Sequence, residues 1–179
     1  MDKHTQYYLD LLKVFESRST CHRLQVGGFL LKNGRIISSA WNGSPSRFRH
    51  CTDYMQKTKE GNPDISDKDL DDAHQYFSKK YEIHVEQNLI CYAARSGISI
   101  EDSILFVSYS PCMDCTKLII NSGIKEVYYR EIYDRAQENW DELFRITGIK
   151  HGFIEAEKNI KTSFSTSGDS PDLPLHQES

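Results

Sequence analysis

The chain has 179 residues, a formal net charge of −4 and 38% hydrophobic residues. This length fits one domain with a sizeable core, and no apolar run approaches the ~20 residues that cross a bilayer, which argues against a membrane protein. The mild acidity argues against a protein that coats nucleic acid, although a few local cations suffice to bind a small anion. Because the opening residues MDKHTQYYLD contain no apolar signal core, we expect a cytoplasmic protein.

The chain begins with a predicted amphipathic helix, in which Tyr8, Leu12 and Phe15 recur at helical spacing. Asn33-Gly34 tolerates positive φ and therefore predicts a hairpin turn between the first two strands. The predicted elements, in chain order, are a helix at 3–17, strands at 25–31 and 35–41, a loop at 42–47, a polar insertion at about 53–82 that is partly helical near its end, a buried helix at 84–97, a strand at 103–109, a helix at 112–122, a strand at 124–129, a helix at 136–147 and a strand at 151–156.

This order places a hairpin before a regular alternation of strands and helices. Such an order predicts the α/β class, with three α/β/α layers around a mixed five-stranded sheet. We expect this domain to occupy residues 1–158, including the polar insertion. Residues 159–179 are rich in Ser, Thr, Pro and Asp and have little to bury, so we expect a flexible tail.

The five cysteines are Cys21, Cys51, Cys91, Cys112 and Cys115. An odd number in a chain without a signal core argues against a disulfide framework and favours metal binding or catalysis. Cys91 lies in an apolar helical stretch, so we expect it to be an ordinary core residue. The spacing of Cys112 and Cys115 is not explained by an ordinary core role.

Pro111-Cys112-Met113-Asp114-Cys115 at one predicted helix start and His84-Val85-Glu86 at another form a constellation that indicates metal chemistry. Two thiolates three positions apart lie on one helix face and can bind one ion, and His84 supplies a third ligand. Three protein ligands with an open fourth position are typical of catalytic zinc, and Glu86 would lie beside a water in that position. Either motif alone is weak, since His-x-Glu is common on surfaces and Cys-x-x-Cys also occurs in structural zinc sites and redox pairs. Together they match the pattern of zinc nucleobase deaminases.

The chemistry expected of such a site is hydrolytic deamination of a pyrimidine. Zinc lowers the pKa of a bound water to roughly 7. Glu86 takes the proton, and the hydroxide attacks the ring carbon that carries the amine. Glu86 then returns protons to the ring nitrogen and to the amine, which leaves as ammonia.

Residues 20–150 resemble the deoxycytidylate (dCMP) deaminases, most closely those of T-even-type phages. The resemblance rests on KNGRIIS at 32–38, NGSP at 42–45, AARSG at 93–97, SPC at 110–112, SGIK at 122–125 and YD at 133–134. It implies a cytidine-deaminase-like fold and the conversion of dCMP to dUMP with release of ammonia. The dUMP would be used for thymidylate synthesis. It also implies His84, Cys112 and Cys115 as ligands of the catalytic zinc and Glu86 as the proton carrier.

The resemblance further implies contacts with the nucleotide. Asn42 would contact the sugar, since an amide can donate and accept hydrogen bonds. Arg23 would pair with the 5′-phosphate, Tyr133 would lie near it, and Ser110 belongs to the same matched region. Each residue also has a simpler structural interpretation: Asn42 as a turn residue before Gly43, Arg23 as a surface arginine and Tyr133 as a core tyrosine.

A second, structural zinc site is also implied by the resemblance, although the residues alone do not group its members. Such an ion would join the first helix, the loop after the hairpin and the insertion, which cannot bury a core of its own. His22 and His50 are possible substitutes as ligands. Taken by itself, Glu82 is equally consistent with a solvated surface carboxylate. The implied ligands are Cys21, Cys51, His74 and Glu82.

The resemblance implies regulation and assembly as well: a homo-hexamer, activated by dCTP and inhibited by dTTP, with Tyr92 and Arg95 in the region linked to that control. Arg95 would equally serve as a cation at a helix C-terminus. The chain departs from the family at three places. Val85 stands where the family has Ala, and Trp41 stands where it has Tyr. The loop Ser46-Arg47-Phe48-Arg49 replaces small, Gly-rich residues.

Three alternatives stay open from sequence. The substrate could be another cytosine nucleotide: a 5-substituted dCMP, CMP or dCTP. A tRNA adenosine or polynucleotide cytosine deaminase would need a positive channel for the strand, which the charge of −4 disfavours. A catalytically silent zinc-binding regulatory subunit would not need Glu86.

Overall fold

The computed structural model describes residues 3–133 and 139–154. The strands are β1 (Gly27–Lys32), β2 (Arg35–Trp41), β3 (Ile104–Tyr109), β4 (Glu126–Glu131) and β5 (Lys150–Phe153). The helices are α1 (Lys3–Glu16), α2 (Cys51–Gly61), α3 (Asp67–Tyr81), α4 (Val85–Ser96), α5 (Met113–Asn121) and α6 (Trp140–Thr147). Within the described residues, no helix combines the length and apolar character needed to span a membrane.

The five strands form one mixed sheet in the order β2-β1-β3-β4-β5. β1 is antiparallel to both β2 and β3, whereas β3, β4 and β5 are parallel. Asn33 and Gly34 both adopt positive φ, at 51° and 74°, as a tight primed turn between two twisted strands requires. The predicted hairpin and the mixed five-stranded sheet are therefore confirmed.

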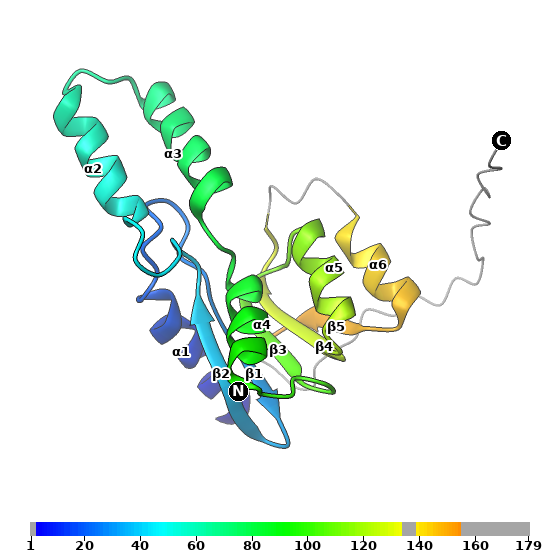
Figure 1. Cartoon of the computed structure of the whole chain (residues 1–179). Coiled ribbons are helices and arrows are strands. Elements are labelled where there is room, and N and C mark those ends of the chain that lie inside the picture. The colour runs from blue at the N-terminus through cyan, green and yellow to red at the C-terminus, as the bar shows by residue number, and fades with distance from the viewer. Residues whose placement is uncertain (1–2, 134–138, 155–179) are drawn as a thin grey trace, which may run out of the picture.

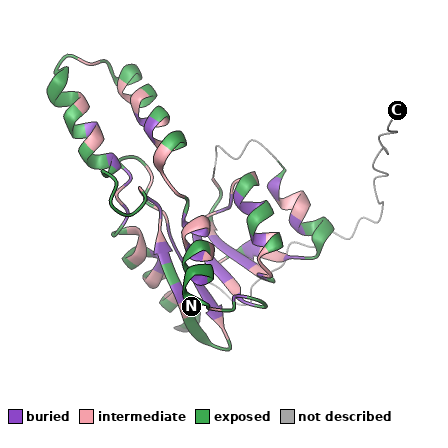
Figure 2. Ribbon diagram, in the orientation of Figure 1, coloured by how far each residue is buried: buried purple, intermediate pink, exposed green. Residues whose placement is uncertain are grey.

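The sheet is covered on both faces, which confirms the predicted three layers (Figure 1). Alternate residues of each strand point to opposite faces. On one face, Phe29 and Phe106 pack with Leu12 of α1. On the other, Leu30 and Leu105 belong to the larger core beneath α4, α5 and α6. Figure 2 shows this burial concentrated along the strands and on the inner helix faces.

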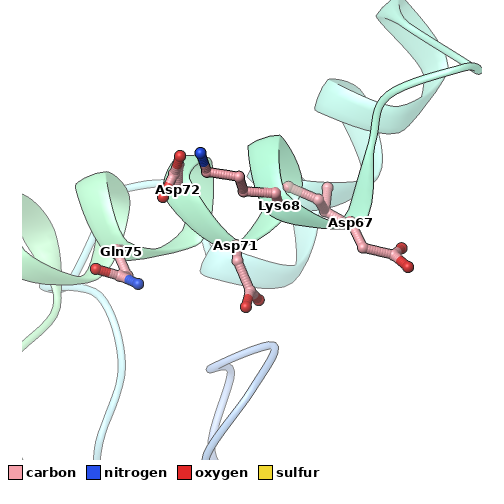
Figure 3. Close-up of a pocket in the computed structure, with 6 residues that line it drawn as sticks. Asp67, Lys68, Asp71, Asp72 and Gln75 are labelled. Carbon is pink, nitrogen blue, oxygen red and sulfur yellow. The ribbon is translucent and has the colours of Figure 1, made fainter.

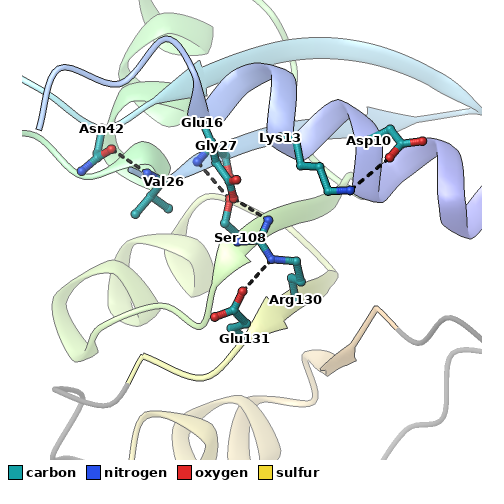
Figure 4. Close-up of polar contacts among 9 residues, drawn as sticks. All are labelled: Asp10, Lys13, Glu16, Val26, Gly27, Asn42, Ser108, Arg130 and Glu131. Atoms are coloured by element: carbon teal, nitrogen blue, oxygen red, sulfur yellow. Dashed lines mark hydrogen bonds and ion pairs between the residues drawn. The ribbon is translucent and has the colours of Figure 1, made fainter. Parts of the chain in front are cut away.

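Polar contacts also tie α1 to the sheet (Figure 4). Arg130 Nη1 on β4 lies 2.7 Å from Glu16 Oε1, and both side chains are largely buried, with 23% and 15% exposed. The Ser108 hydroxyl accepts from Gly27 N–H at 3.1 Å and donates to Gly27 O at 3.0 Å, joining β3 to β1. These contacts hold the start of β1 and the end of β4 against α1.

The polar insertion is more helical than the sequence indicates. α2 and α3 form a hairpin that projects away from the sheet (Figure 1). Ser66 caps α3 by accepting from Asp69 N–H at 3.1 Å. The hairpin has a small core of its own, centred on Met55 and Phe77. High Asp and Lys content hides the helical period in this stretch, because few positions are apolar.

Helix α4 confirms one expectation from sequence and contradicts another. Gly97 ends α4 in the left-handed conformation, with φ 66°, as predicted. Cys91 is exposed rather than part of the core, because α4 is amphipathic and buries Val85, Leu89 and Ala93 instead. The expected flexible tail at 159–179, the helix start at 136–138 and the strand end at 155–156 lie outside the described residues.

Candidate active site and metal centres

The first metal-binding cluster consists of His84, Cys112 and Cys115, whose ligand atoms all lie within 4.8 Å of one another. His84 is the N-cap of α4, Cys112 is the N-cap of α5, and Cys115 lies in the first turn of α5. His84 Nδ1 lies 3.5 Å from both sulfur atoms. Two helix N-termini therefore converge on one point, as predicted, and their positive ends favour thiolates there.

These distances fit a tetrahedral zinc ion. Bonds of about 2.3 Å to sulfur and 2.0 Å to nitrogen would hold those two atoms about 3.5 Å apart. The observed separations of His84 Nδ1 from Cys112 Sγ and Cys115 Sγ have this value. Since only three side chains contribute, the fourth position is left for water or substrate, as in catalytic zinc sites.

The two thiols of this cluster have opposite pKa shifts because they share one hydrogen bond. The Cys115 thiol donates to Cys112 and lowers the Cys112 pKa to about 4. Cys115 keeps its proton, and its pKa is raised by that bond and by burial. The hydrogen bond between His84 and Cys112 raises the His84 pKa to about 9. The pair of thiols therefore gives up only one proton by itself, and a bound divalent cation would supply the charge that allows both sulfur atoms to be thiolates.

Glu86 lies in the first turn of α4 and is only 5% exposed. Burial raises the pKa of its carboxyl group, while the charge of His84 partly opposes that shift. A buried carboxyl group with a raised pKa is suited both to accept and to donate a proton. Its position two residues after His84 gives it access to the same small volume as the cluster.

The second cluster unites the four residues that the sequence leaves scattered: Cys21, Cys51, His74 and Glu82. Cys21 Sγ lies 3.5 Å from His74 Nε2 and 3.4 Å from Glu82 Oε2. Cys51 donates to Cys21 and lowers the Cys21 pKa to about 3, while burial raises the Glu82 pKa to about 7. Cys, His and Glu side chains can all bind zinc, and four protein ligands would close the coordination shell, as in structural zinc sites.

Two buried atoms of the second cluster, His74 Nδ1 and Glu82 Oε1, make no hydrogen bond to another described protein group. Buried polar atoms of this kind normally find partners. The Glu82 carboxyl group therefore has unused binding capacity in the cluster, whereas Nδ1 lies on the other side of the His74 ring from the Nε2 that faces Cys21. His22 and His50, the substitutes considered from sequence, are exposed and lie outside the group.

Asn42 is 9% exposed and its amide is almost fully used inside the fold. Its Oδ1 accepts from Val26 N–H at 2.8 Å and from the Ser19 hydroxyl at 2.6 Å. Its Nδ2 donates to Leu24 O at 2.8 Å. One N–H therefore remains, so this side chain can donate to a ligand, whereas its oxygen is already saturated.

The other sequence-predicted contacts lie in different surroundings. Arg23 pairs with Asp71 of α3 at 3.3 Å. Asp71 also lines an open hollow along α3, together with Asp67, Asp72 and Lys68 (Figure 3). Ser110 is buried, and its hydroxyl accepts from Tyr133 N–H at 2.9 Å. Tyr92 and Arg95 are exposed on α4.

Two contacts near the first cluster could not be foreseen from sequence. Ser19 reaches Asn42 across 23 positions, and Asn88 Nδ2 donates to Trp41 O at 2.8 Å across 47 positions. A single serine after a helix and an asparagine inside one carry no local signal of such long-range partners. Only the fold reveals them, because it brings the segment after α1 and the first turns of α4 to the end of β2.

Comparison with known proteins agrees with this geometry. The family model for the cytidine and deoxycytidylate deaminase zinc-binding region matches residues 1–131 of this chain. Deoxycytidylate deaminase of Enterobacteria phage T4 is 38% identical over 174 residues, which cover 85% of this chain and 90% of that protein. Its counterpart in Enterobacteria phage T2 is 37% identical over 164 residues, covering 79% and 87%. The crystal structure of dCMP deaminase from cyanophage S-TIM5 in complex with dCMP and dUMP is 29% identical, with a TM-score of 0.65, covering 86% of this chain and 98% of that one.

The mixed sheet and its flanking helices have the cytidine-deaminase-like α/β fold, as predicted. The chain belongs to the cytidine and deoxycytidylate deaminase zinc-binding family.

Proposed function

We propose that this protein hydrolyses dCMP to dUMP and ammonia, using one zinc ion held by His84, Cys112 and Cys115. The observation that carries the proposal is the three-ligand cluster at two helix N-termini, with the buried Glu86 beside it. The deoxycytidylate deaminases among the relatives support dCMP as the substrate.

The chemistry divides between the ion and the chain. When bound, zinc acts as a Lewis acid that lowers the pKa of a water molecule. In the hydrolysis, Glu86 accepts a proton from the attacking water molecule, and the water oxygen bonds to the amine-bearing ring carbon. Glu86 delivers this proton to the ring nitrogen, and it then carries the second water proton from the new hydroxyl group to the amine, so that the carbon–nitrogen bond breaks and water and dCMP become dUMP and ammonia. The raised pKa of Glu86 suits both directions of transfer.

For substrate contacts, we assign the remaining N–H of Asn42 to a sugar hydroxyl. Ser110 holds the backbone of Tyr133 next to the segment that leads into Cys112, and Tyr133 then faces the phosphate. Arg23 contributes to phosphate binding by exchanging its exposed partner Asp71 for the nucleotide.

The second cluster binds a structural zinc ion under this proposal. Its ligands come from the loop after α1, from α2 and from α3, so one ion joins all three segments. The small core of the insertion supports this role, because metal binding contributes directly to the folding of small modules. We expect two zinc ions per chain, and a measured value near one would contradict the second site.

Regulation and assembly complete the proposal: a homo-hexamer in the host cytoplasm, activated by dCTP and inhibited by dTTP. Tyr92 and Arg95 are the effector residues in this scheme. Their exposure on α4, with Tyr92 at 49%, is compatible with contact to an effector or a neighbouring subunit.

An ultraviolet deamination assay tests the function. The substrates are deoxycytidine, dCMP, dCTP, CMP, a 5-substituted dCMP and a single-stranded oligonucleotide, each with and without dCTP or dTTP. We expect the highest kcat/KM with dCMP and no turnover of the oligonucleotide. A higher value with another nucleotide would reassign the substrate, and a zinc-loaded protein that releases no ammonia from any of them would be a silent binding subunit.

A further inference from the structure

Three short segments meet between the two candidate metal clusters. This junction, as we call it, consists of residues 19–21, 42–43 and 82–84. Gly43 and Ile83 exchange two backbone hydrogen bonds, of 3.2 and 2.8 Å. A side-chain carbon on Gly43 would come within 2.7 Å of the Thr20 hydroxyl, so those two segments are in direct contact. The three segments are therefore packed without space between them.

The junction contributes ligands to both clusters. Glu82 belongs to the second cluster and His84 to the first, and only Ile83 separates them. Glu82 is the C-cap of α3 with φ −81° and ψ 145°, and His84 is the N-cap of α4 with φ −70° and ψ 156°. Because this connection is extended and bonded to Gly43, a shift of Glu82 displaces His84 as well.

A second connection runs through side chains. Cys21 N–H donates to Ser19 Oγ at 3.2 Å, and the Ser19 hydroxyl donates to Asn42 Oδ1 at 2.6 Å. Ser19 and Asn42 are 8% and 9% exposed, so water does not compete effectively for these bonds. The segment that carries Cys21 therefore helps to hold the Asn42 amide, together with Val26 N–H and Leu24 O.

We propose that the Cys21/Cys51/His74/Glu82 cluster is a positioning element of the active site. An ion held there places Asn42 through Ser19 and places His84 through Glu82, in addition to joining the insertion to the domain. This inference rests on the proposed function for its substrate. A cluster that only attached the insertion to the domain would affect the stability of α2 and α3 and would leave nucleotide binding unchanged.

The variant Ser19→Ala tests the side-chain connection without touching either set of ligands. We expect the KM for dCMP to rise about five- to tenfold, as for the loss of one buried hydrogen bond, with kcat and the zinc content per chain unchanged. The matched control is Ser17→Ala, since Ser17 is exposed and donates only to Val14 O within the same helix end. An unchanged KM in the Ser19 variant would overturn this connection.

The variant His74→Ala tests the cluster itself from a site ten residues away from His84. We expect loss of one zinc per chain, together with an increased KM for dCMP and at least tenfold faster release of the remaining zinc to a chromophoric chelator. A chain that loses one zinc but keeps the wild-type KM and the wild-type release rate for the other would refute the proposal. If this variant does not fold, the Ser19→Ala result decides alone.

The zinc-release measurement needs no substrate. A wild-type protein that fails to deaminate dCMP would refute the proposed function, while the release rates would still decide whether the clusters are coupled.

Discussion

Replacing Asn42 by alanine is expected to lower the free energy of unfolding by about 3 kcal/mol. The substitution removes three side-chain hydrogen bonds, to Val26 N–H, Leu24 O and the Ser19 hydroxyl, of 2.8, 2.8 and 2.6 Å. An ordinary buried hydrogen bond contributes about 1 kcal/mol, and partners left unpaired in the interior add to the loss. Asn42 therefore matters to the stability of the fold, independently of the sugar contact proposed for it.

The measurement is urea unfolding of the zinc-loaded protein, with a thermal midpoint expected to fall by roughly 6–12 °C for a domain of this size. Asn42→Asp should be at least as destabilising, because it places an oxygen against Leu24 O where Nδ2 now donates. The control is Asn121→Ala, which loses one exposed hydrogen bond to Lys117 O and should change stability by less than about 0.5 kcal/mol. A loss below about 1 kcal/mol for Asn42→Ala would refute the structural reasoning.

Three further predictions follow from the clusters and the ion pairs. Glu86→Gln should reduce kcat by ~10²- to 10⁴-fold, the usual contribution of a general acid–base group, with zinc content retained in metal analysis; activity within tenfold of wild type would exclude this role. Cys51→Ala should lower the zinc content by one per chain, whereas Cys91→Ala, outside both clusters and exposed, should leave it unchanged. Arg130→Ala should destabilise the fold by about 3 kcal/mol in urea unfolding, because it leaves a largely buried carboxylate unpaired. Arg145→Ala, which removes an exposed pair of 3.7 Å, serves as its control and should cost about 0.5 kcal/mol or less.

The first cluster could be predicted from sequence because its information is local. His84 and Cys112 are helix N-caps, and Cys115 follows Cys112 by nearly one helical turn. Spacing and the position of Pro111 therefore determine the direction of both sulfur atoms once the helix is recognised. Only the distance between α4 and α5 had to come from the fold.

The second cluster could not be derived in this way. Cys21 and His74 are 53 positions apart, yet their ligand atoms lie 3.5 Å apart. No periodic pattern links a loop, a helix start and a helix interior, so only a family resemblance grouped them. The exposure of Cys91 has a related cause: an apolar helical stretch indicates burial of the helix but not which face is buried.

The position of the second cluster changes how the insertion is understood. α2 and α3 could have been attached to the domain by apolar contacts anywhere along the hairpin. Phe48 does pack on Phe77 and Tyr81 of α3. In addition, Cys21 follows Ser19, which bonds to Asn42, and Glu82 is separated from His84 by one residue. An apolar attachment would tolerate small sliding movements, whereas ligands of one ion have fixed distances. Under the proposal that an ion binds here, its ligands would set the register between the Asn42 amide and the His84 imidazole, which a hydrophobic contact of the same strength would leave adjustable.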